Sequence, residues 1–185
     1  MVIDKLRASN IRAPVAFFYF DYQDEVQQTP TAVLSSILKQ LLITQTDLPK
    51  SILKAYEERH HSGTIFSLEQ LEDFLHDVLK SLHQAYIVID ALDECDKSRN
   101  RKPLLLLFQR LQKISNISLF VTSRQNFQDI IDVFSRYPQI TITAHNVDLE
   151  RYMRQEMENY SIEETVDDSF VNGIISAVIT KAQGM

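Results

Sequence analysis

Short apolar runs alternate with segments of helical periodicity along the sequence, and this alternation limits the possible folds more than any other feature. The apolar runs predict strands at 15–22, 86–90, 117–122 and 139–143. Between them, apolar residues recur every three or four positions, which predicts helices at about 30–42, 49–59, 68–83, 104–114 and 127–134. Strands that alternate with helices indicate an α/β fold, with a parallel sheet covered by helices on both faces.

Local signals place several element ends. Thr29 and Pro30 are typical of a helix N-cap and first turn, and Ser67 with Gln70 predicts a capping box. Residues 60–63 are predicted to form a loop after the second helix. Two more helices are expected at 147–160 and 168–181, after the last strand, so a domain boundary is predicted near Asn146.

Composition excludes several classes of protein. None of the apolar stretches approaches the roughly 18 residues that a membrane span requires, and the N-terminus lacks the apolar core of a secretory signal. With a single cysteine, Cys95, we expect a cytoplasmic protein without an internal disulfide framework and without a membrane partner. The net charge is −6 and no long basic run exists, which argues against nucleic acid as a partner.

Glycine is scarce in this sequence. The 185 residues contain three glycines, and no two of them are close together. A phosphate-binding loop of the GxxxxGK[ST] or GxGxxG pattern needs two or three glycines within a few positions. These residues therefore contain no phosphate-binding loop of either kind.

An acidic turn follows the second predicted strand. Asp90 comes at the end of the strand, and Asp93, Glu94 and Asp96 follow within six positions. Ligands of α/β sheets collect beyond the carboxyl ends of the strands, where converging carboxylates need a cation between them. Magnesium fits this requirement, because it takes one or two carboxylates and completes its shell with water and phosphate oxygens. The alternative is an acidic turn that caps the next helix and pairs with a nearby basic residue, Lys97 or Arg99.

A polar tip also follows the third predicted strand. Thr122, Ser123 and Arg124 end the run 117–124, so Arg124 is expected at the same sheet edge as Asp90. A guanidinium at this position can contact a γ-phosphate. The alternative is that Ser123 caps the following helix while Arg124 neutralises the acidic cluster, and both descriptions can hold together.

The two strand tips together resemble a known family. IVIDALDEC, at 87–95, resembles the Walker B strand of the NACHT class of signalling P-loop NTPases, and LFVTSR, at 119–124, resembles its sensor-1 strand. Residues 17–42 are similar to the second strand and following helix of fungal NACHT proteins of the nephrocystin-like type. The resemblance covers nearly the whole chain, including KAQGM at 181–185.

This resemblance implies a P-loop NTPase-like fold and an ATP- or GTP-dependent switch. By position, Asp90 is implied to hold Mg²⁺ through water, and Asp93 and Glu94 to be the further acids, one of which orients the attacking water. Arg124 is implied to be the phosphate sensor. The implied organisation is a NACHT-type core at 1–145 and the start of a C-terminal helical region at 146–185.

The sequence departs from the family at its start. Residues 1–10 resemble the tail of the helix that follows the Walker A loop, so we expect an incomplete core without that loop and without the first strand. In the family order that strand lies between the fourth and fifth, so its loss would open the sheet beside 119–124. Three adjacent strands, with the last one displaced, would agree with this expectation; a complete five-stranded sheet would contradict it.

Two functional hypotheses follow. In the first, the chain is a truncated NACHT-type switch domain whose NTP binding and hydrolysis belong to the full-length family member. Mg²⁺ and ATP or GTP are then held weakly or not at all here, and protein partners or self-association depend on flanking domains. In the second, the chain is a nucleotide-free protein–protein interaction module that retains the NTPase fold.

Overall fold

A computed structural model describes residues 2–8, 13–24, 27–62, 65–114, 116–143, 145–159 and 167–182. The chain forms two compact units, Met1–Arg136 and Tyr137–Met185. The first unit contains the sheet and most of the apolar core.

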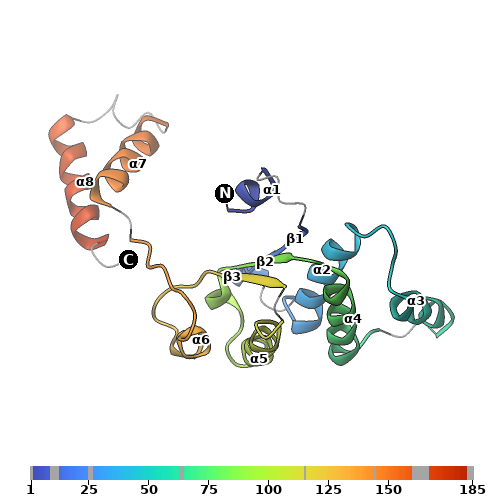
Figure 1. The fold of residues 1–185 in the computed structure, drawn as a ribbon. Coiled ribbons are helices and arrows are strands. Elements are labelled where there is room, and N and C mark those ends of the chain that lie inside the picture. Colours follow the sequence, from blue (N-terminus) through green and yellow to red (C-terminus); the bar gives the residue numbers. More distant parts are fainter. Residues whose placement is uncertain are drawn as a thin grey trace. The chain divides into compact units, whose positions relative to one another are not determined.

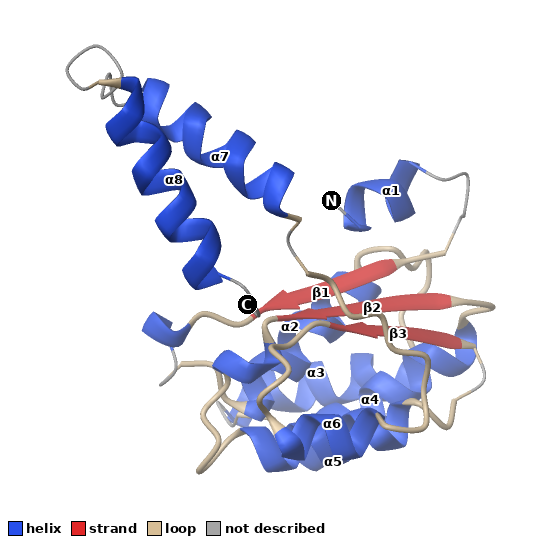
Figure 2. Ribbon diagram, turned by 90° about the vertical axis from the view of Figure 1, so that its left-hand side faces the viewer, coloured by secondary structure: helices blue, strands red, loops and turns tan. Residues whose placement is uncertain are grey.

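The sheet of the first unit has three parallel strands in the order β1-β2-β3 (Figure 2). These are β1 (Val15–Tyr19), β2 (Ala85–Asp90) and β3 (Ile117–Val121). The register pairs Phe18 with Ile89, and Ile89 with Val121. Because all three strands run the same way, their carboxyl ends meet at one edge of the sheet.

Helices flank this sheet unequally (Figure 1). The face opposite α1 (Val2–Ala8) is covered by α2 (Pro30–Leu42), α4 (Leu68–Ser81) and α5 (Arg101–Leu111). Side chains of the strands and of these helices form one core, whose fully buried members include Ile87, Ile89, Leu34, Leu75 and Phe108. Each large apolar side chain buried in this way contributes about 1.5–3 kcal/mol, so this layer dominates the stability of the unit.

The predicted helix starts are confirmed. The Thr29 hydroxyl accepts a hydrogen bond from the Ala32 amide at 3.3 Å, and Pro30 is the first residue of α2. Ser67 and Gln70 form the reciprocal capping box of α4, with distances of 3.0 and 3.2 Å. These caps satisfy backbone amides that the first helical turn leaves without partners.

Two local predictions of element ends are wrong. α3 (Lys50–Ser62) continues through His60 and His61, which were expected in a loop. β1 ends at Tyr19, and the chain then forms a short 3₁₀ turn, η1 (Tyr22–Asp24). The apolar periodicity of these segments does not define their ends, because an end depends on which neighbours are available.

The fourth predicted strand is also absent, since residues 138–143 have no regular secondary structure. Ile140 and Ile142 are 85% and 84% exposed. Their alternation with polar residues is typical of a strand, but a strand exists only when a neighbour accepts and donates its backbone hydrogen bonds. The described chain therefore has three adjacent strands and an unpaired fourth segment, which agrees with the expectation of an incomplete sheet.

The second face of the sheet is only partly covered. α1 contacts β1 on this face, and Val88 is buried there, but Tyr19 and Phe120 remain 42% and 41% exposed. The prediction of cover on both faces therefore holds only in part.

The second unit contains α7 (Asn146–Asn159) and α8 (Asp168–Ala182). Its core is small and centres on Met157, Val171 and Ile175. Arg154 joins the two helices, because its Nη2 donates to Glu150 Oε1 at 2.9 Å and to Asn172 Oδ1 at 2.8 Å. The expected family boundary near Asn146 remains a prediction.

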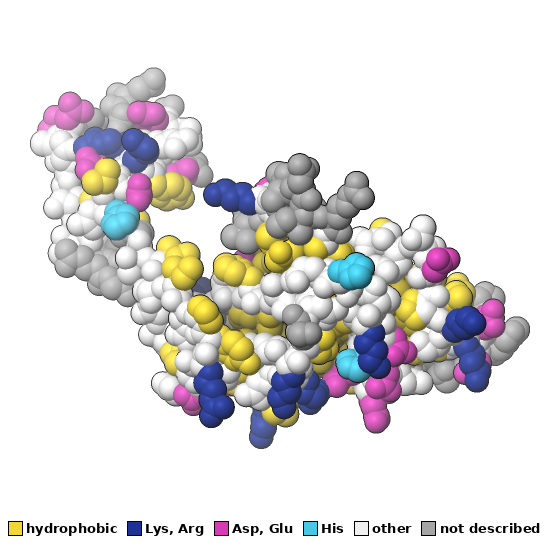
Figure 3. Space-filling view, viewed as in Figure 1, with side chains coloured by type: hydrophobic (Ala, Val, Ile, Leu, Met, Phe, Trp, Pro, Cys, Tyr) yellow, Lys and Arg dark blue, Asp and Glu magenta, His cyan; other side chains and the backbone are white. Residues whose placement is uncertain are grey.

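The surface of the first unit mixes charged and apolar side chains. Figure 3 shows Lys and Arg side chains around α5 and α6 (Gln128–Phe134), with hydrophobic side chains scattered between the polar ones. None of the helices in the described ranges is both long enough and apolar enough to cross a membrane.

Candidate functional site

The ends of all three strands are joined by backbone hydrogen bonds at one edge of the sheet. The Phe20 amide donates to Asp90 O at 3.0 Å, and the Leu92 amide donates to Thr122 O at 3.0 Å. These bonds lie beyond the last paired residues, so they fix the loops as well as the strands. The residues that follow each strand are therefore held close to those that follow its neighbour.

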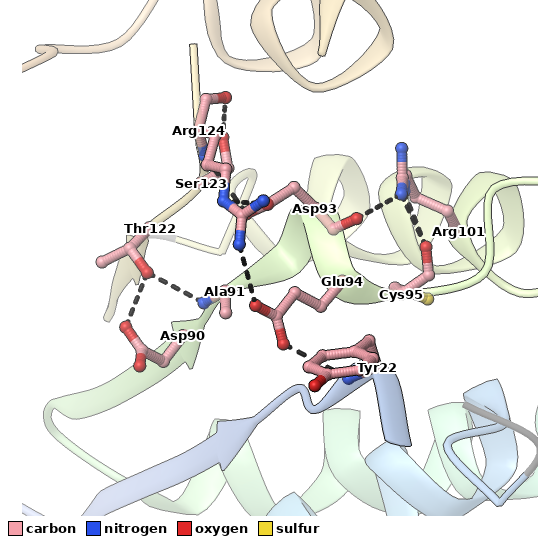
Figure 4. Close-up of polar contacts among 10 residues, drawn as sticks. All are labelled: Tyr22, Asp90, Ala91, Asp93, Glu94, Cys95, Arg101, Thr122, Ser123 and Arg124. Atoms are coloured by element: carbon pink, nitrogen blue, oxygen red, sulfur yellow. Dashed lines mark hydrogen bonds and ion pairs between the residues drawn. The ribbon is translucent and has the colours of Figure 1, made fainter. Parts of the chain in front are cut away.

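Asp90 and Thr122 form the first part of the site, which we call the strand tip (Figure 4). The Thr122 hydroxyl donates to Asp90 Oδ1 at 2.6 Å and accepts from the Ala91 amide at 2.9 Å. Within the described chain, the second carboxylate oxygen of Asp90 has no protein hydrogen-bond partner. The strand tip thus orients a carboxylate with a neutral hydroxyl and leaves one of its oxygens available.

Ala91 turns the chain after the strand tip. Its φ of 52° and ψ of 46° are left-handed, and it is the one non-glycine residue with positive φ among those the structure describes. This conformation costs an L-residue about 1–2 kcal/mol. It allows Leu92 to return into the core, where it is fully buried, and it starts the 3₁₀ turn η2 (Leu92–Glu94).

The second part of the site is the acidic turn, which we define as Asp93–Asp96. Arg124, at the tip of β3, contacts two of its carboxylates (Figure 4). Arg124 Nε lies 3.4 Å from Asp93 Oδ2, and Nη2 lies 3.4 Å from Glu94 Oε1. The Arg124 amide also donates to Asp93 Oδ1 at 3.1 Å.

These partners differ in burial. The Asp93 side chain is 4% exposed and the Arg124 side chain is 73% exposed. A guanidinium in solvent gains about 0–1 kcal/mol from such an ion pair. Asp93 is therefore fixed, and the Arg124 side chain can exchange Glu94 for another anion at small cost, whereas departure from the buried Asp93 would leave that carboxylate without its counter-charge.

Glu94 connects the acidic turn to the loop after β1. Its Oε2 accepts a hydrogen bond from the Tyr22 amide at 3.3 Å, while its Oε1 faces Arg124. A cavity of about 460 Å³ opens here. It is lined by residues that follow each of the three strands, including Tyr22, Glu94, Arg124 and Phe127. Asp90 does not line this cavity.

Asp96 closes the acidic turn. Hydrogen bonds from the Ser98 hydroxyl and the Ser98 amide, at 2.7 and 2.8 Å, lower the pKa of the Asp96 carboxyl. Both donors stabilise the ionised form, so this carboxylate stays charged at lower pH than usual.

The described residues contain no group of three His, Cys, Asp or Glu side chains placed to hold a metal ion. Magnesium does not require such a cage, because one carboxylate, water and phosphate oxygens complete its shell. The partly free carboxylate of Asp90 fits that role. The carboxylates of Asp93 and Glu94 are already occupied by Arg124.

The structure therefore brings together three of the four predicted site residues. Asp93, Glu94 and Arg124 are in direct contact, and Asp90 lies at the neighbouring strand tip. Their assigned roles in metal binding, water activation and phosphate sensing remain predictions. Cys95, in the same turn, is buried, with 2% exposure.

Ser123 does not cap the following helix. Its hydroxyl donates to Arg124 O at 3.1 Å, and the N-cap residue of α6 is Phe127, which makes no side-chain cap bond. The other alternative, that Arg124 neutralises the acidic cluster, agrees with the observed ion pairs.

Sequence reasoning missed Arg101 and Ala91. Arg101 lies under the acidic turn, with 3% exposure, and its guanidinium donates to backbone carbonyls there. The predicted helix begins at 104, whereas α5 begins at Arg101, so the position at which a basic side chain opposes the helix dipole was not recognised. No sequence signal identifies the left-handed conformation of Ala91.

The first unit is thus an α/β domain with an acidic turn and an arginine at the carboxyl edge of a parallel sheet. The model of the family described as nephrocystin 3, N-terminal, matches residues 1–124, and the chain belongs to this family. A search of curated proteins gives no match to the chain.

Proposed function

We propose that the chain contains the metal-facing part of a NACHT-type nucleotide switch, and that these 185 residues bind nucleotide weakly. NTP binding and hydrolysis then belong to a complete family member. One observation carries the proposal: Arg124 at the tip of β3 contacts both Asp93 and Glu94 after β2. This contact gathers acidic and basic groups at the sheet edge where α/β proteins bind ligands.

The geometry gives each residue a distinct task. Asp90 would hold Mg²⁺ through water, using the oxygen that Thr122 leaves free. Bound Mg²⁺ would neutralise charge that develops on the phosphates. Glu94 lines the cavity and accepts one backbone hydrogen bond, so its carboxylate is placed to orient a water molecule, with Asp93 beside it.

Arg124 acts in this proposal as an exchangeable cation. In the absence of phosphate its exposed guanidinium balances two carboxylates, through ion pairs at 3.4 Å to the buried Asp93 and to Glu94. A γ-phosphate offers a guanidinium a stronger bidentate contact than these pairs do. Phosphate binding would therefore release the acidic turn from Arg124, and the site would respond to the nucleotide.

Weak binding follows from the glycine content. The 185 residues have no glycine-rich phosphate loop, which normally supplies backbone amides and a lysine to the β- and γ-phosphates. Charge-assisted hydrogen bonds contribute about 1.5–3 kcal/mol each, so the loss of two weakens affinity by about two to four orders of magnitude.

The test uses Mn²⁺ as a paramagnetic substitute for Mg²⁺. We expect added Mn²⁺ to broaden the NMR signals of the Asp90 and Ala91 amides before those of other residues. Asp90→Asn should abolish this preference. The matched control, Asp73→Asn, changes an exposed carboxylate on α4 and should leave the preference intact. Broadening without preference for the strand tip would refute the proposed metal role.

A titration with Mg²⁺ and a fluorescent ATP or GTP analogue tests the second half of the proposal. We expect no saturation at micromolar concentration. Micromolar affinity would show that the site is complete without a phosphate loop, and would contradict the proposed impairment.

The alternative, a nucleotide-free interaction module, has one observation in its favour. The second unit exposes large apolar side chains, with Ile140, Ile142 and Val147 at 85%, 84% and 72%. Exposed apolar residues that lie close together favour protein association. Under this alternative the chain self-associates, and Ile140→Ser/Ile142→Ser makes it monomeric in sedimentation experiments. A monomeric wild-type chain would remove the support for self-association.

A further inference from the structure

Arg101 is a buried cation in an unfavourable place for a helix. It is the first residue of α5, where the helix dipole places partial positive charge, and its side chain is 3% exposed. Burial of a charge costs several kcal/mol unless its partners compensate for the lost water. The reason for an arginine at this position must therefore lie in its contacts.

One set of contacts holds the backbone of the acidic turn (Figure 4). Arg101 Nη2 donates to Asp93 O at 2.5 Å and to Cys95 O at 2.6 Å, and Nε donates to Cys95 O at 3.1 Å. Asp93 and Cys95 are the residues on either side of Glu94. A single planar guanidinium thus fixes the backbone on both sides of the Glu94 carboxylate.

A second set of contacts reaches the chain that follows Arg124. Arg101 Nη1 lies 3.5 Å from Asp129 Oδ2, in the first turn of α6. The guanidinium carbon lies 4.9 Å from the centre of the Phe127 ring. Phe127 is three residues after Arg124. The Arg101 side chain therefore contacts both the acidic turn and the segment that follows Arg124.

We propose that Arg101 is a positioning residue that holds the acidic turn and the segment after Arg124 in one arrangement. It acts through the backbone of Asp93 and Cys95, and through Phe127 and Asp129. The use of the held turn, to face a metal and a phosphate, rests on the proposed function; the holding itself does not.

Stability alone does not account for this arginine. Replacement of a buried ion pair by apolar residues of similar volume is often neutral or stabilising. A lysine would carry the same charge, but it lacks the planar fork that donates to two carbonyls while one of its nitrogens faces a carboxylate. The geometry of the guanidinium is therefore the property to test.

The experiment compares Arg101→Lys with wild type by amide hydrogen exchange in the absence of nucleotide. The reporting amides are those of Glu94, Cys95 and Arg124, which donate to Ala91 O, Leu92 O and Asp93 Oδ1. We expect their protection to fall about tenfold or more beyond any fall at the Ala85 and Tyr86 amides, which lie at the other end of β2 and report a global loss of stability.

A matched control is Arg110→Lys, on the same helix. Arg110 also bonds through its guanidinium, to Glu72 at 2.6 and 2.7 Å, but it is exposed and distant in sequence from the turn. This variant should leave the three reporting amides and the Ala85 and Tyr86 amides unchanged. Equal loss of protection at both ends of β2 in Arg101→Lys, or no loss, would overturn the proposal.

Arg101→Met covers the case in which lysine does not fold, because it keeps the apolar stem without the charge. It should show the same additional loss of protection at the turn, beyond any fall at the start of β2. If neither variant folds, Arg101 is a stability determinant and the proposal fails. The Mn²⁺ experiment on wild type reports separately on the proposed function. A failure of the proposed function is therefore distinguishable from a failure of the positioning role of Arg101.

Discussion

The strand tip and the acidic turn lie side by side at the edge of the sheet, but they are held by different forces. At the strand tip, a neutral hydroxyl from Thr122 orients Asp90 and leaves one carboxylate oxygen free. In the acidic turn, two arginines act from opposite sides: Arg124 faces the carboxylates and Arg101 holds the backbone.

The strand tip has no basic side chain beside its carboxylate in the described chain, whereas the acidic turn already contains a cation, Arg124. The strand tip keeps its negative charge uncompensated by any basic side chain in the described chain, as a metal ligand requires. The acidic turn has its charge balanced, so its carboxylates become available only when Arg124 finds another anion. Under the proposed function, the strand tip would bind the metal ion and the acidic turn would respond to phosphate.

The largest effect should come from loss of the buried cation. Arg101→Ala leaves two carbonyls without their donor and the Asp129 carboxylate without its ion-pair partner, and we expect the free energy of unfolding to fall by about 3 kcal/mol. The exposed Arg110→Ala should cost less than about 1 kcal/mol. Urea unfolding followed by circular dichroism measures both. Similar costs for the two variants would show that the acidic turn does not depend on a buried charge.

A smaller effect is expected at the strand tip. Thr122→Val removes the donor to Asp90 and the acceptor for the Ala91 amide, at a cost of about 1–2 kcal/mol. Thr122→Ser keeps the hydroxyl and should stay within about 1 kcal/mol of wild type. The same unfolding experiment applies. If serine is as damaging as valine, the methyl group and not the hydroxyl orients this tip.

A change at Ala91, between the two regions, should alter the free energy of unfolding with the opposite sign. Ala91→Gly relieves a left-handed conformation that costs about 1–2 kcal/mol, offset by about 0.5–1 kcal/mol of extra chain entropy, so stability should rise by about 0.5 kcal/mol. Ala55→Gly, inside α3, should lower it by about 1 kcal/mol. A destabilised Ala91→Gly variant would mean that Ala91 is not left-handed in solution.

The smallest effect is expected at Asp96, the last residue of the acidic turn, where the change concerns the pKa alone. Ser98→Ala removes the hydroxyl donor to Asp96 but keeps the amide donor, so the lowered pKa of Asp96 should rise part of the way to its ordinary value. A carboxyl with a depressed pKa stabilises the fold above its unfolded pKa, and this contribution disappears as the pH falls through the folded pKa. Carbon-13 NMR titration of Asp96 measures the change. An unchanged pKa would assign the effect to the backbone amide.

Much of the fold was predictable because its signals are local. The caps at Thr29 and Ser67 act within one helical turn, and the apolar run before Asp90 can only be buried. The unpaired state of 139–143 could be expected only from the family order of strands, because the segment's own pattern is that of a strand and a strand also needs a neighbour to pair with.

The sequence by itself determined the parallel α/β arrangement, the acidic turn after β2 and the arginine after β3. Periodicity and strand ends depend on residues that are close together in the sequence. The tertiary structure alone decided that Thr122 orients Asp90, that Ala91 is left-handed, and that Arg101 lies beneath the turn. These contacts join residues up to 32 positions apart, so they depend on the packing of whole strands and helices. These contacts contribute to the free energy of the chain only in the folded state.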